Sequence, residues 1–417
     1  MADATSTAPA VPPPASGATP PPGPGPGRRR RTLLWAALTL AVAVGVAFAW
    51  AAHRAGGYFE YTPGDAPQVT TATTCALRGS SGTLTLPGGS PCARVVVPPG
   101  RGAPIDGRLL MVDVLVGRPT PQDVLLDELG LLGTVHRGAQ LLPAAEVLGS
   151  TPASQMACQD AQQMTDATRS AAVAALTRLG QKVGTTRLGA RVVQVEPGSG
   201  AAAGGVRCND LVTAIDGHPV GDAAEVAAAV HASAPGQEVS LTVQRPDGKG
   251  GATTLTLHAR LGSVPARPAT PEAPAAPAQP HTAFLGVATS DDVRYDLPFP
   301  VSAEVGDIGG PSAGLALTLG MLDTLSGGHL IGGHVVAATG TIAPDGAVGD
   351  VGGVAQKAIA VSRAGAQVFF VPPQEYAAAL SHAGHMRVVA VRSLGQALAV
   401  LEQMGGALPP TAGTATA

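Results

Sequence analysis

An apolar stretch of 21 residues without a charge, residues 32–52, most constrains what the chain can fold into. As a helix rising about 1.5 Å per residue, this stretch spans the roughly 30 Å core of a lipid bilayer. Trp35 and Trp50, the only two tryptophans, lie near its two ends, where aromatic side chains favour the membrane interface. The sequence therefore predicts one transmembrane helix at residues 32–52.

The charges that flank this stretch predict its orientation. Four arginines at residues 28–31 precede it, whereas only His53 and Arg54 follow it closely. Positive flanks stay in the cytoplasm, so we expect a single-pass protein of the cell membrane with most of the chain outside the cytoplasm. A cleaved signal peptide is the alternative, because residues 47–49 are Ala-Phe-Ala. The apolar stretch is longer than a usual signal core, and a long Pro-rich leader precedes it. Both interpretations export the rest of the chain.

Charge and cysteine content narrow the function classes. A formal net charge of -3 argues against a nucleic-acid-binding protein, which needs a concentrated basic face. Cys75 and Cys92 flank a short Gly-rich segment, and a disulfide between them would be worth about 3 kcal/mol. Cys158 and Cys208 are isolated in the sequence, and free buried thiols are the alternative for all four cysteines. No CxxC pair and no Cys/His spacing indicates a metal site.

Composition and hydrophobic pattern divide the chain into seven parts. The first is expected to be a disordered Pro-rich cytoplasmic tail with a basic flank. After the transmembrane helix we expect a β-rich segment that ends in a helix at about residues 155–179, a second β-rich unit, an extended Pro/Ala linker and a unit of alternating strands and helices. The tail is expected at 1–31, the transmembrane helix at 32–52 and the first β-rich segment at 57–180. The second β-rich unit follows at 183–262, the linker at 263–281, the unit of alternating strands and helices at 282–404, and a C-terminal tail at 405–417.

The unit at residues 183–262 has the order strand, RCNDLVTAIDGHPV, helix, strand. This order resembles the PDZ domains of bacterial HtrA-type proteins, with Asn209-Asp210 where that family usually has Gly-Asp. The resemblance implies a domain that binds the end of a peptide as an added strand. It places the loop whose backbone N–H groups hold the terminal carboxylate at Arg187, Leu188, Gly189 and Ala190. A purely structural PDZ domain is the alternative.

A candidate nucleophile lies in the sixth part. Residues 309–314 read Gly-Gly-Pro-Ser-Ala-Gly and lead into an apolar run, so we expect a buried helix over residues 311–326. Proline is favoured at a first helical position, which places Ser312 at the helix N-terminus. There, unpaired N–H groups and the helix dipole favour a developing negative charge. The alternative is a serine that only caps the helix.

A candidate base follows in the same part. Only three of the 26 basic residues are lysines, namely Lys182, Lys249 and Lys357. Arginine cannot serve as a neutral base, whereas lysine can. Lys357 lies on a predicted helix at 354–364, among apolar neighbours at helical spacing, and desolvation there would lower its pKa. The alternative is a lysine at the edge of the apolar stripe that extends its amine to solvent.

These motifs together resemble the proteolytic domain of Lon-type serine proteases. In that family the nucleophile lies in D-G-P-S-A-G and the base in G-G-x-x-x-K-x-x-A-x-x-A-G, followed by V-x-x-P-x-E. The resemblance implies that Ser312 is the nucleophile and Lys357 its base, that the Thr339 hydroxyl orients the amine, and that backbone N–H groups near Gly310 hold the oxyanion. With the membrane helix and the PDZ domain, the arrangement is similar to that of bacterial YlbL-like PDZ–Lon proteins.

Two departures from the family pattern matter. The acidic residue expected three positions before the serine is Gly309 here, so Asp307, five before, is the remaining candidate for its role. The chain also has no G-x-x-x-x-G-K-[ST], which argues against ATP-driven unfolding. His329 and His334 flank a turn and are expected to be loop residues.

We therefore expect an α/β (α+β) Lon-type proteolytic domain, a β-rich PDZ domain and one N-terminal transmembrane helix. The predicted activity is that of an ATP-independent serine endopeptidase, without metal, cofactor or nucleic acid. Its predicted partners are flexible or misfolded protein segments, delivered by the PDZ domain. Lon-type domains tend to form rings, so an oligomer is one expectation, although the missing ATPase removes one reason for a ring. An inactive PDZ scaffold and an amidase of the cell envelope are the alternatives.

Overall fold

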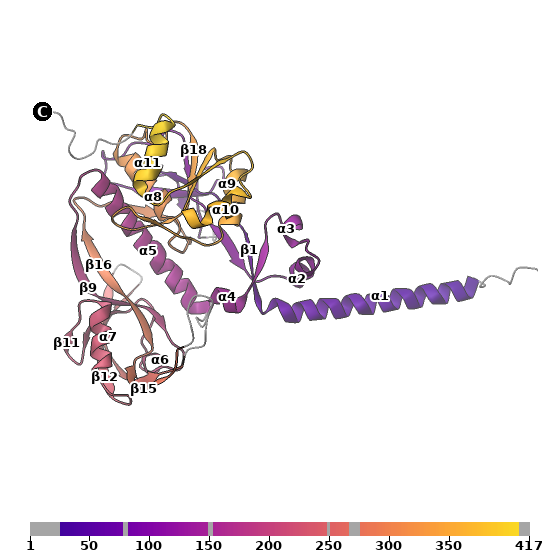
Figure 1. The fold of residues 1–417 in the computed structure, drawn as a ribbon, viewed down its shortest axis with the longest axis horizontal. Coiled ribbons are helices and arrows are strands. Elements are labelled where there is room, and N and C mark those ends of the chain that lie inside the picture. The colour runs from indigo at the N-terminus through magenta and orange to yellow at the C-terminus, as the bar shows by residue number, and fades with distance from the viewer. Residues whose placement is uncertain (1–25, 78–81, 149–152, 248–250, 267–275, 408–417) are drawn as a thin grey trace, which may run out of the picture.

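The first described helix, α1 (Pro26–Ala55), projects away from the rest of the molecule (Figure 1). The computed structural model describes residues 26–77, 82–148, 153–247, 251–266 and 276–407, so the predicted N-terminal tail and most of the C-terminal tail lie outside it. Within α1, Leu33–Ala55 has a mean hydropathy of 2.1, and none of its most apolar window is buried. By length and composition this helix can cross a membrane, and a signal sequence would pass the same test.

The centre of the main domain is a seven-stranded sheet. Four strands at one side, β6, β18, β21 and β22, pair in parallel. They read as short apolar runs such as Val-Phe-Phe-Val, as parallel strands covered on both faces do. In spatial order the strands are β17 (Ser302–Glu304), β5 (Cys92–Val96), β2 (Gln68–Thr70), β6 (Arg108–Leu110), β18 (Val335–Ala338), β21 (Val368–Val371) and β22 (Arg387–Ala390).

Helices cover both faces of this sheet. Phe370 and its neighbours on one face pack against the helices α5 (Ala153–Arg178), α8 (Gly314–Leu325) and α11 (Leu394–Gln403). Phe369 and its neighbours on the other face pack against α9 (Val354–Arg363) and α10 (Tyr376–Leu380). Successive strand residues point to opposite faces, so the two phenylalanines contribute to separate cores. The predicted α/β architecture is therefore present.

One predicted domain boundary is wrong. Residues 57–180 and 282–404, separated in the sequence analysis, share this sheet, because β2, β5 and β6 lie between β17 and β18. Local patterns identify a strand but not its partner, and these strands pair with segments more than 200 residues away. Other parts of 57–180 form a three-stranded sheet beside α1, of order β7 (Val114–Gly117), β1 (Tyr58–Pro63), β8 (Gln140–Pro143), with α2 (Pro121–Glu128), α3 (Leu132–Val135) and α4 (Ala144–Leu148).

The second domain is built on a sheet of five strands in a row, with one further short strand paired at its side. Its core includes the helix α7 and the short helix α6. The strands are, in spatial order, β13 (Ala252–Arg260), β12 (Glu238–Pro246), β10 (Leu211–Ile215), β9 (Gly184–Val195) and β16 (Val287–Asp296), with β11 (His218–Pro219) on β10. The helices are α6 (Gly200–Ala203) and α7 (Ala223–His231).

The predicted end of this domain at 262, and the predicted start of the next at 282, are also wrong. β16 pairs with β9 from Val287 to Asp296, and Ala283 and Leu285 lie in the core of the second domain. The ends of the predicted linker at 263–281 form the paired strands β14 (Gly262–Val264) and β15 (Gln279–Phe284), while its middle, 267–275, lies outside the described residues. A Pro/Ala composition predicts an extended chain, and extended ends can pair.

The remaining described elements are short. They are the strands β3 (Ala76–Leu77), β4 (Leu84–Thr85), β19 (Thr341–Ile342) and β20 (Val348–Gly349), and a 3₁₀ turn at Pro373–Glu375.

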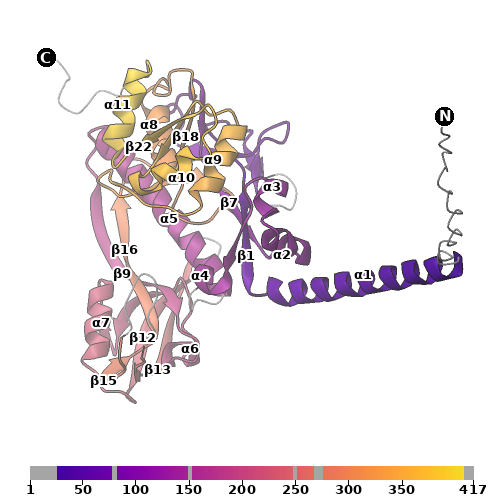
Figure 2. The same ribbon diagram turned by 45° about the vertical axis from the view of Figure 1, so that its right-hand side comes forward.

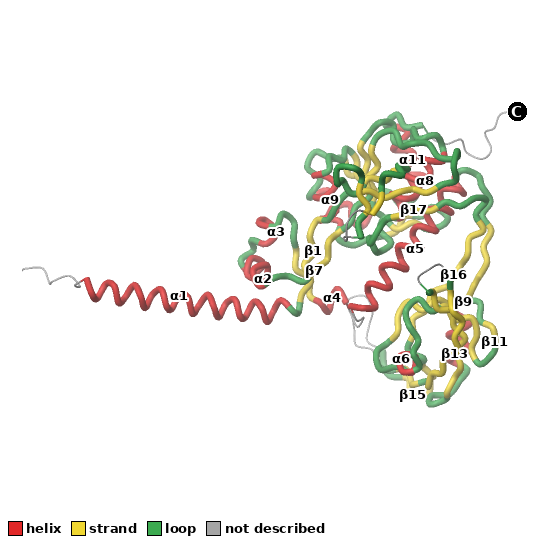
Figure 3. The backbone as a smooth tube through the Cα atoms, turned by 180° about the vertical axis from the view of Figure 1, so that it is seen from behind, coloured by secondary structure: helices red, strands yellow, loops and turns green. Residues whose placement is uncertain are grey.

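The second domain is thus inserted into the first and is fastened to it at α5. The strands β9 and β16 lead from one domain to the other (Figures 2 and 3). A disulfide joins Cys158 of α5 to Cys208 of the second domain. Beside it, the Gln155 side chain both donates to and accepts from the backbone of Val195. A second disulfide, Cys75–Cys92, closes a loop of the main domain, so the four cysteines pair.

We expect the interdomain disulfide to be worth more than the local one. The two bonds close 50 and 17 residues, which corresponds to about 4 and 3 kcal/mol of lost unfolded-state entropy. Replacing Cys158 and Cys208 by serine should lower the thermal midpoint more than the same change at Cys75 and Cys92. Equal losses, or no loss from the first pair, would contradict this prediction.

Candidate active site

Ser312 lies in a turn that immediately precedes α8. The helix begins at Gly314, not at Pro311 as predicted. The reason is that the Ser312 carbonyl accepts hydrogen bonds from Gly340 N–H (2.9 Å) and the Thr339 hydroxyl (3.2 Å), so it is not part of the helical ladder. The helix itself is buried along nearly its whole length, as its apolar sequence predicted. Ser312 is thereby held at the end of β18.

Lys357 is brought to the same place by α9. Lys357 is only 4% exposed, because Val354, Ala358 and Val361 of the same helix pack in the core. The Lys357 amine donates to the Thr339 hydroxyl at 3.2 Å, which is the contact that the sequence motif predicted. Thr339 therefore contacts both the amine and the backbone of Ser312.

Burial lowers the pKa of Lys357 from 10.5 to about 8, while Asp113 and Glu375 oppose this shift by attracting the ammonium. A pKa of about 8 leaves roughly a tenth of the amine neutral at pH 7. An ordinary lysine would be neutral in less than about one molecule in a thousand at that pH. The site therefore supplies a usable fraction of neutral amine near physiological pH, as general-base catalysis requires.

Sequence reasoning missed the two carboxylates that face Lys357. An oxygen of Asp113 accepts the Asp65 N–H at 2.7 Å, and burial raises the pKa of Asp113 although Lys357 partly counteracts this. One Glu375 oxygen accepts the Val351 N–H at 3.0 Å, and the other is buried without a hydrogen-bond partner in the described part of the chain. Glu375 is the last residue of Val-Pro-Pro-Gln-Glu, so the motif contained a signal for it. For Asp113 the signal was a lone acid inside an apolar run.

Two predicted supporting residues are placed differently. The Gly310 N–H donates to the Asp160 carbonyl of α5 at 2.8 Å, so in this structure it is not available to an oxyanion. The Asp307 N–H donates to the Gly82 carbonyl at 3.1 Å, and its carboxylate lies against the same glycine. Among the described residues, the carboxylates that act on Lys357 are Asp113 and Glu375, not Asp307, because the loop directs Asp307 away toward Gly82.

The two histidines that follow α8, His329 and His334, are loop residues, as predicted. Both ring nitrogens of His334 lie near other acceptors, the Gln367 side chain at 3.0 Å and the Met404 carbonyl at 2.9 Å. His329 faces Asp106 at 3.8 Å. Neither histidine forms a described contact with Ser312.

The predicted carboxylate-binding loop of the second domain is wrong. Arg187, Leu188, Gly189 and Ala190 lie within β9 and not in a loop. β16 pairs with this stretch on one side, and β10 pairs with Ala190 on the other. The prediction failed because the partner strand β16 comes about 100 residues later in the chain. The edge strand next to β9 is β16, which begins at Val287, directly after the sequence Phe-Leu-Gly at 284–286.

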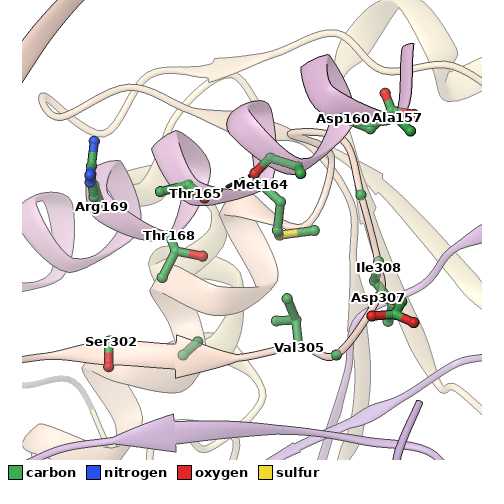
Figure 4. A pocket seen from close by; sticks show the side chains of 14 residues that line it. Ala157, Asp160, Met164, Thr165, Thr168, Arg169, Ser302, Val305, Asp307 and Ile308 are labelled. Carbon is green, nitrogen blue, oxygen red and sulfur yellow. Dashed lines mark hydrogen bonds between the residues drawn. The ribbon is translucent and has the colours of Figure 1, made fainter. Parts of the chain in front are cut away.

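A groove of about 830 Å³ leads to the loop that precedes Ser312. Figure 4 shows its two walls, with Asp160, Met164 and Thr168 on α5 facing β17 and the loop that follows it. Val305, Ile308 and Gly309 line the second wall, so the groove ends three residues before Ser312. Since β17 is the outermost strand of the seven-stranded sheet, the groove lies beside a strand with an unpaired edge among the described residues.

Comparison with known proteins matches both domains to families. Residues 177–258 match the PDZ domain, and residues 251–398 match the C-terminal proteolytic domain of Lon protease (S16). Serine protease PepD of Mycobacterium tuberculosis is 41% identical over 70 residues, which cover 17% of this chain and 15% of PepD. The chain thus spans only a small part of this curated relative.

Two solved PDZ domains, of SdrC-like proteins from Listeria monocytogenes and Listeria innocua, are 19% and 20% identical to this chain. They cover 25% and 24% of it, and 90% and 92% of their own chains, with TM-scores of 0.20 and 0.19.

We expect Lys357→Met to stabilise the folded protein. Because the pKa of Lys357 is lowered, its ammonium proton is held less tightly in the folded than in the unfolded state. The free energy of unfolding therefore rises with pH between about 8 and 10.5. Below pH 8 the penalty is fully present, and its removal is worth about 3 kcal/mol at pH 7. Denaturant unfolding at pH 7 measures this gain, with the exposed Lys182→Met as control. A variant less stable than its parent would contradict the burial argument.

Proposed function

Because the chain carries a PDZ domain and the C-terminal proteolytic domain of Lon-type proteases, we propose that it is an ATP-independent serine endopeptidase with a Ser312–Lys357 dyad. The observation that carries this proposal is the buried Lys357 amine, whose pKa is lowered to about 8 and whose hydrogen-bond partner Thr339 also holds the backbone of Ser312. A domain that served only as a scaffold would have no use for a destabilising buried lysine.

In the proposed reaction, neutral Lys357 takes the proton of the Ser312 hydroxyl as its oxygen attacks the carbonyl carbon of a peptide bond. Lys357 then gives this proton to the leaving amine, and an ester on Ser312 remains. In the second half, Lys357 takes a proton from water, the resulting hydroxide attacks the ester, and the proton returns to Ser312. The Ser312 hydroxyl forms no described hydrogen bond, and such catalytic contacts often tighten only when substrate is bound.

We place the oxyanion at the turn before α8. Since Gly310 N–H is bonded to Asp160, the remaining donors are the N–H groups of Ser312 and Ala313, neither of which donates a hydrogen bond within the described residues. Two backbone donors beside a nucleophile are a common means of stabilising a developing oxyanion.

The groove supports a flexible substrate. An extended segment laid between α5 and the edge strand β17 would gain main-chain hydrogen bonds, as added strands do, and would lead into the catalytic loop at Gly309. A compact folded protein offers no such free strand. The sequence has no phosphate-binding loop for ATP, so the substrates we propose are unfolded or exposed segments.

We propose that the PDZ domain delivers these segments. Its edge strand β16 lies beside α7, which is the strand-and-helix arrangement that PDZ domains use to bind a peptide end. The domain is fastened to α5 by the Cys158–Cys208 disulfide, and α5 is also one wall of the groove. With α1 as a membrane anchor and the basic residues 28–31 in the cytoplasm, both domains would work outside the cytoplasm.

The direct test uses the purified full chain in detergent micelles with an unfolded protein substrate and no ATP. We expect the parent and the exposed-lysine control Lys182→Ala to cleave it, and Ser312→Ala and Lys357→Ala to lose cleavage. Added ATP should not change the rate. No cleavage by a folded parent that still binds peptides would favour the scaffold, and cleavage that needs ATP would contradict ATP independence.

The pH dependence tests the role of Lys357. Since the active form is the neutral amine, kcat/KM should rise about tenfold per pH unit below pH 8 and level off above it. Asp113 raises the pKa of Lys357, so Asp113→Asn should move the midpoint to lower pH. Asp307→Asn, the matched control, should leave the midpoint unchanged. A flat profile, or equal shifts in both variants, would refute the assignment.

A further inference from the structure

Three side chains with metal-binding atoms meet on the side of the main domain that carries α1. Glu60 comes from β1, Asp123 from the first turn of α2, and His136 from the end of α3. One ligand atom from each lies within 4.8 Å of the other two. The His136 Nδ1 atom is 3.3 Å from an Asp123 oxygen and 3.5 Å from a Glu60 oxygen.

These distances suit a shared ion better than direct pairing. An N–H···O hydrogen bond has its heavy atoms about 2.9 Å apart, and neither contact of His136 is a described hydrogen bond. Ligand atoms that each lie 2.0–2.1 Å from one tetrahedral zinc ion are separated by about 3.3 Å. The two distances from His136 are therefore close to those between ligands around one ion, and the Glu60 and Asp123 ligand atoms lie within 4.8 Å of each other.

The Asp123 carboxylate is already oriented for this role. Asp123 is only 4% exposed, and one of its oxygens accepts the Thr120 N–H at 2.7 Å and the Thr120 hydroxyl at 2.6 Å. The other oxygen is thereby directed at His136. Metal-binding carboxylates are commonly fixed by such outer hydrogen bonds.

The charge of the cluster also calls for a cation. Glu60 and Asp123 form no described ion pair with any lysine or arginine, so the two carboxylates share one imidazole. The Glu60 side chain is only 15% exposed, where negative charge is poorly compensated by water. His136 is 41% exposed, which leaves an open side for a water as fourth ligand.

From this geometry we propose that Glu60, Asp123 and His136 bind one divalent transition-metal ion, for which Zn²⁺ fits the mixed nitrogen and oxygen ligands best. The ion would fasten the α2–α3 segment to β1. The chain after His136 then contacts α9, the helix that carries Lys357. The Gly138 carbonyl accepts a hydrogen bond from the Gln356 side chain at 3.3 Å, and the Arg137 carbonyl accepts one from Arg363 at 3.0 Å. The site thus has a structural role, because it fixes the segment that contacts the helix of Lys357.

The test is calorimetric titration of the full chain, in micelles and stripped of metal with EDTA, with ZnCl₂. All four cysteines are in disulfides, so they do not compete for zinc. We expect one saturable site per chain and a higher thermal midpoint with zinc. His136→Ala and Glu60→Gln should each weaken binding by about tenfold or more and remove the thermal shift.

His329→Ala is the matched control, since His329 also faces a carboxylate, Asp106, at the surface, and it should bind zinc like the parent. Both test residues lie outside the α2 capping hydrogen bonds, so their variants should fold. The proposal is overturned by absence of saturable zinc binding in the parent. It is equally overturned if His136→Ala and Glu60→Gln bind zinc as tightly as the control.

Discussion

The burial of one ammonium group, that of Lys357, is the constraint on which the active site depends. Burying this lysine to 4% exposure lowers the stability of the folded protein. The apolar side chains of α9, which pack in the core beneath the sheet, offset this loss. Thr339, at the end of β18, is the point where the amine and the Ser312 backbone meet. Asp113 and Glu375 moderate the shift without cancelling it, so the amine titrates near physiological pH.

The inserted PDZ domain and the turn that carries Ser312 both contact one helix, α5. α5 packs against α8, which follows the catalytic turn, and carries Cys158, which is bonded to the PDZ domain. Its Asp160 carbonyl holds Gly310, two residues before the proposed nucleophile. The helix α5 therefore contacts both the PDZ domain and the loop that carries Ser312.

The contacts of Thr339 with the Ser312 backbone and the Lys357 amine could be predicted because all three residues lie in motifs that resemble those of Lon-type proteases. The parts that failed depend on pairing between distant segments. β5 pairs with β17 across some 200 residues. The residues near Arg187, which were predicted to form a loop, lie in β9 and pair with the distant strand β16. Gly310 and Asp307 were misplaced because their hydrogen-bond partners, Asp160 and Gly82, come from other parts of the chain.

The most direct measurement is the pKa of Lys357 itself. The chain has only three lysines, so ¹³C labelling of lysine side chains gives three NMR signals in the full protein, and Lys357→Met identifies the one of interest. The account predicts that the Lys357 signal titrates near pH 8. A Lys357 signal that titrates near 10.5, the ordinary value for lysine, would contradict it, because a fully charged Lys357 cannot act as the base.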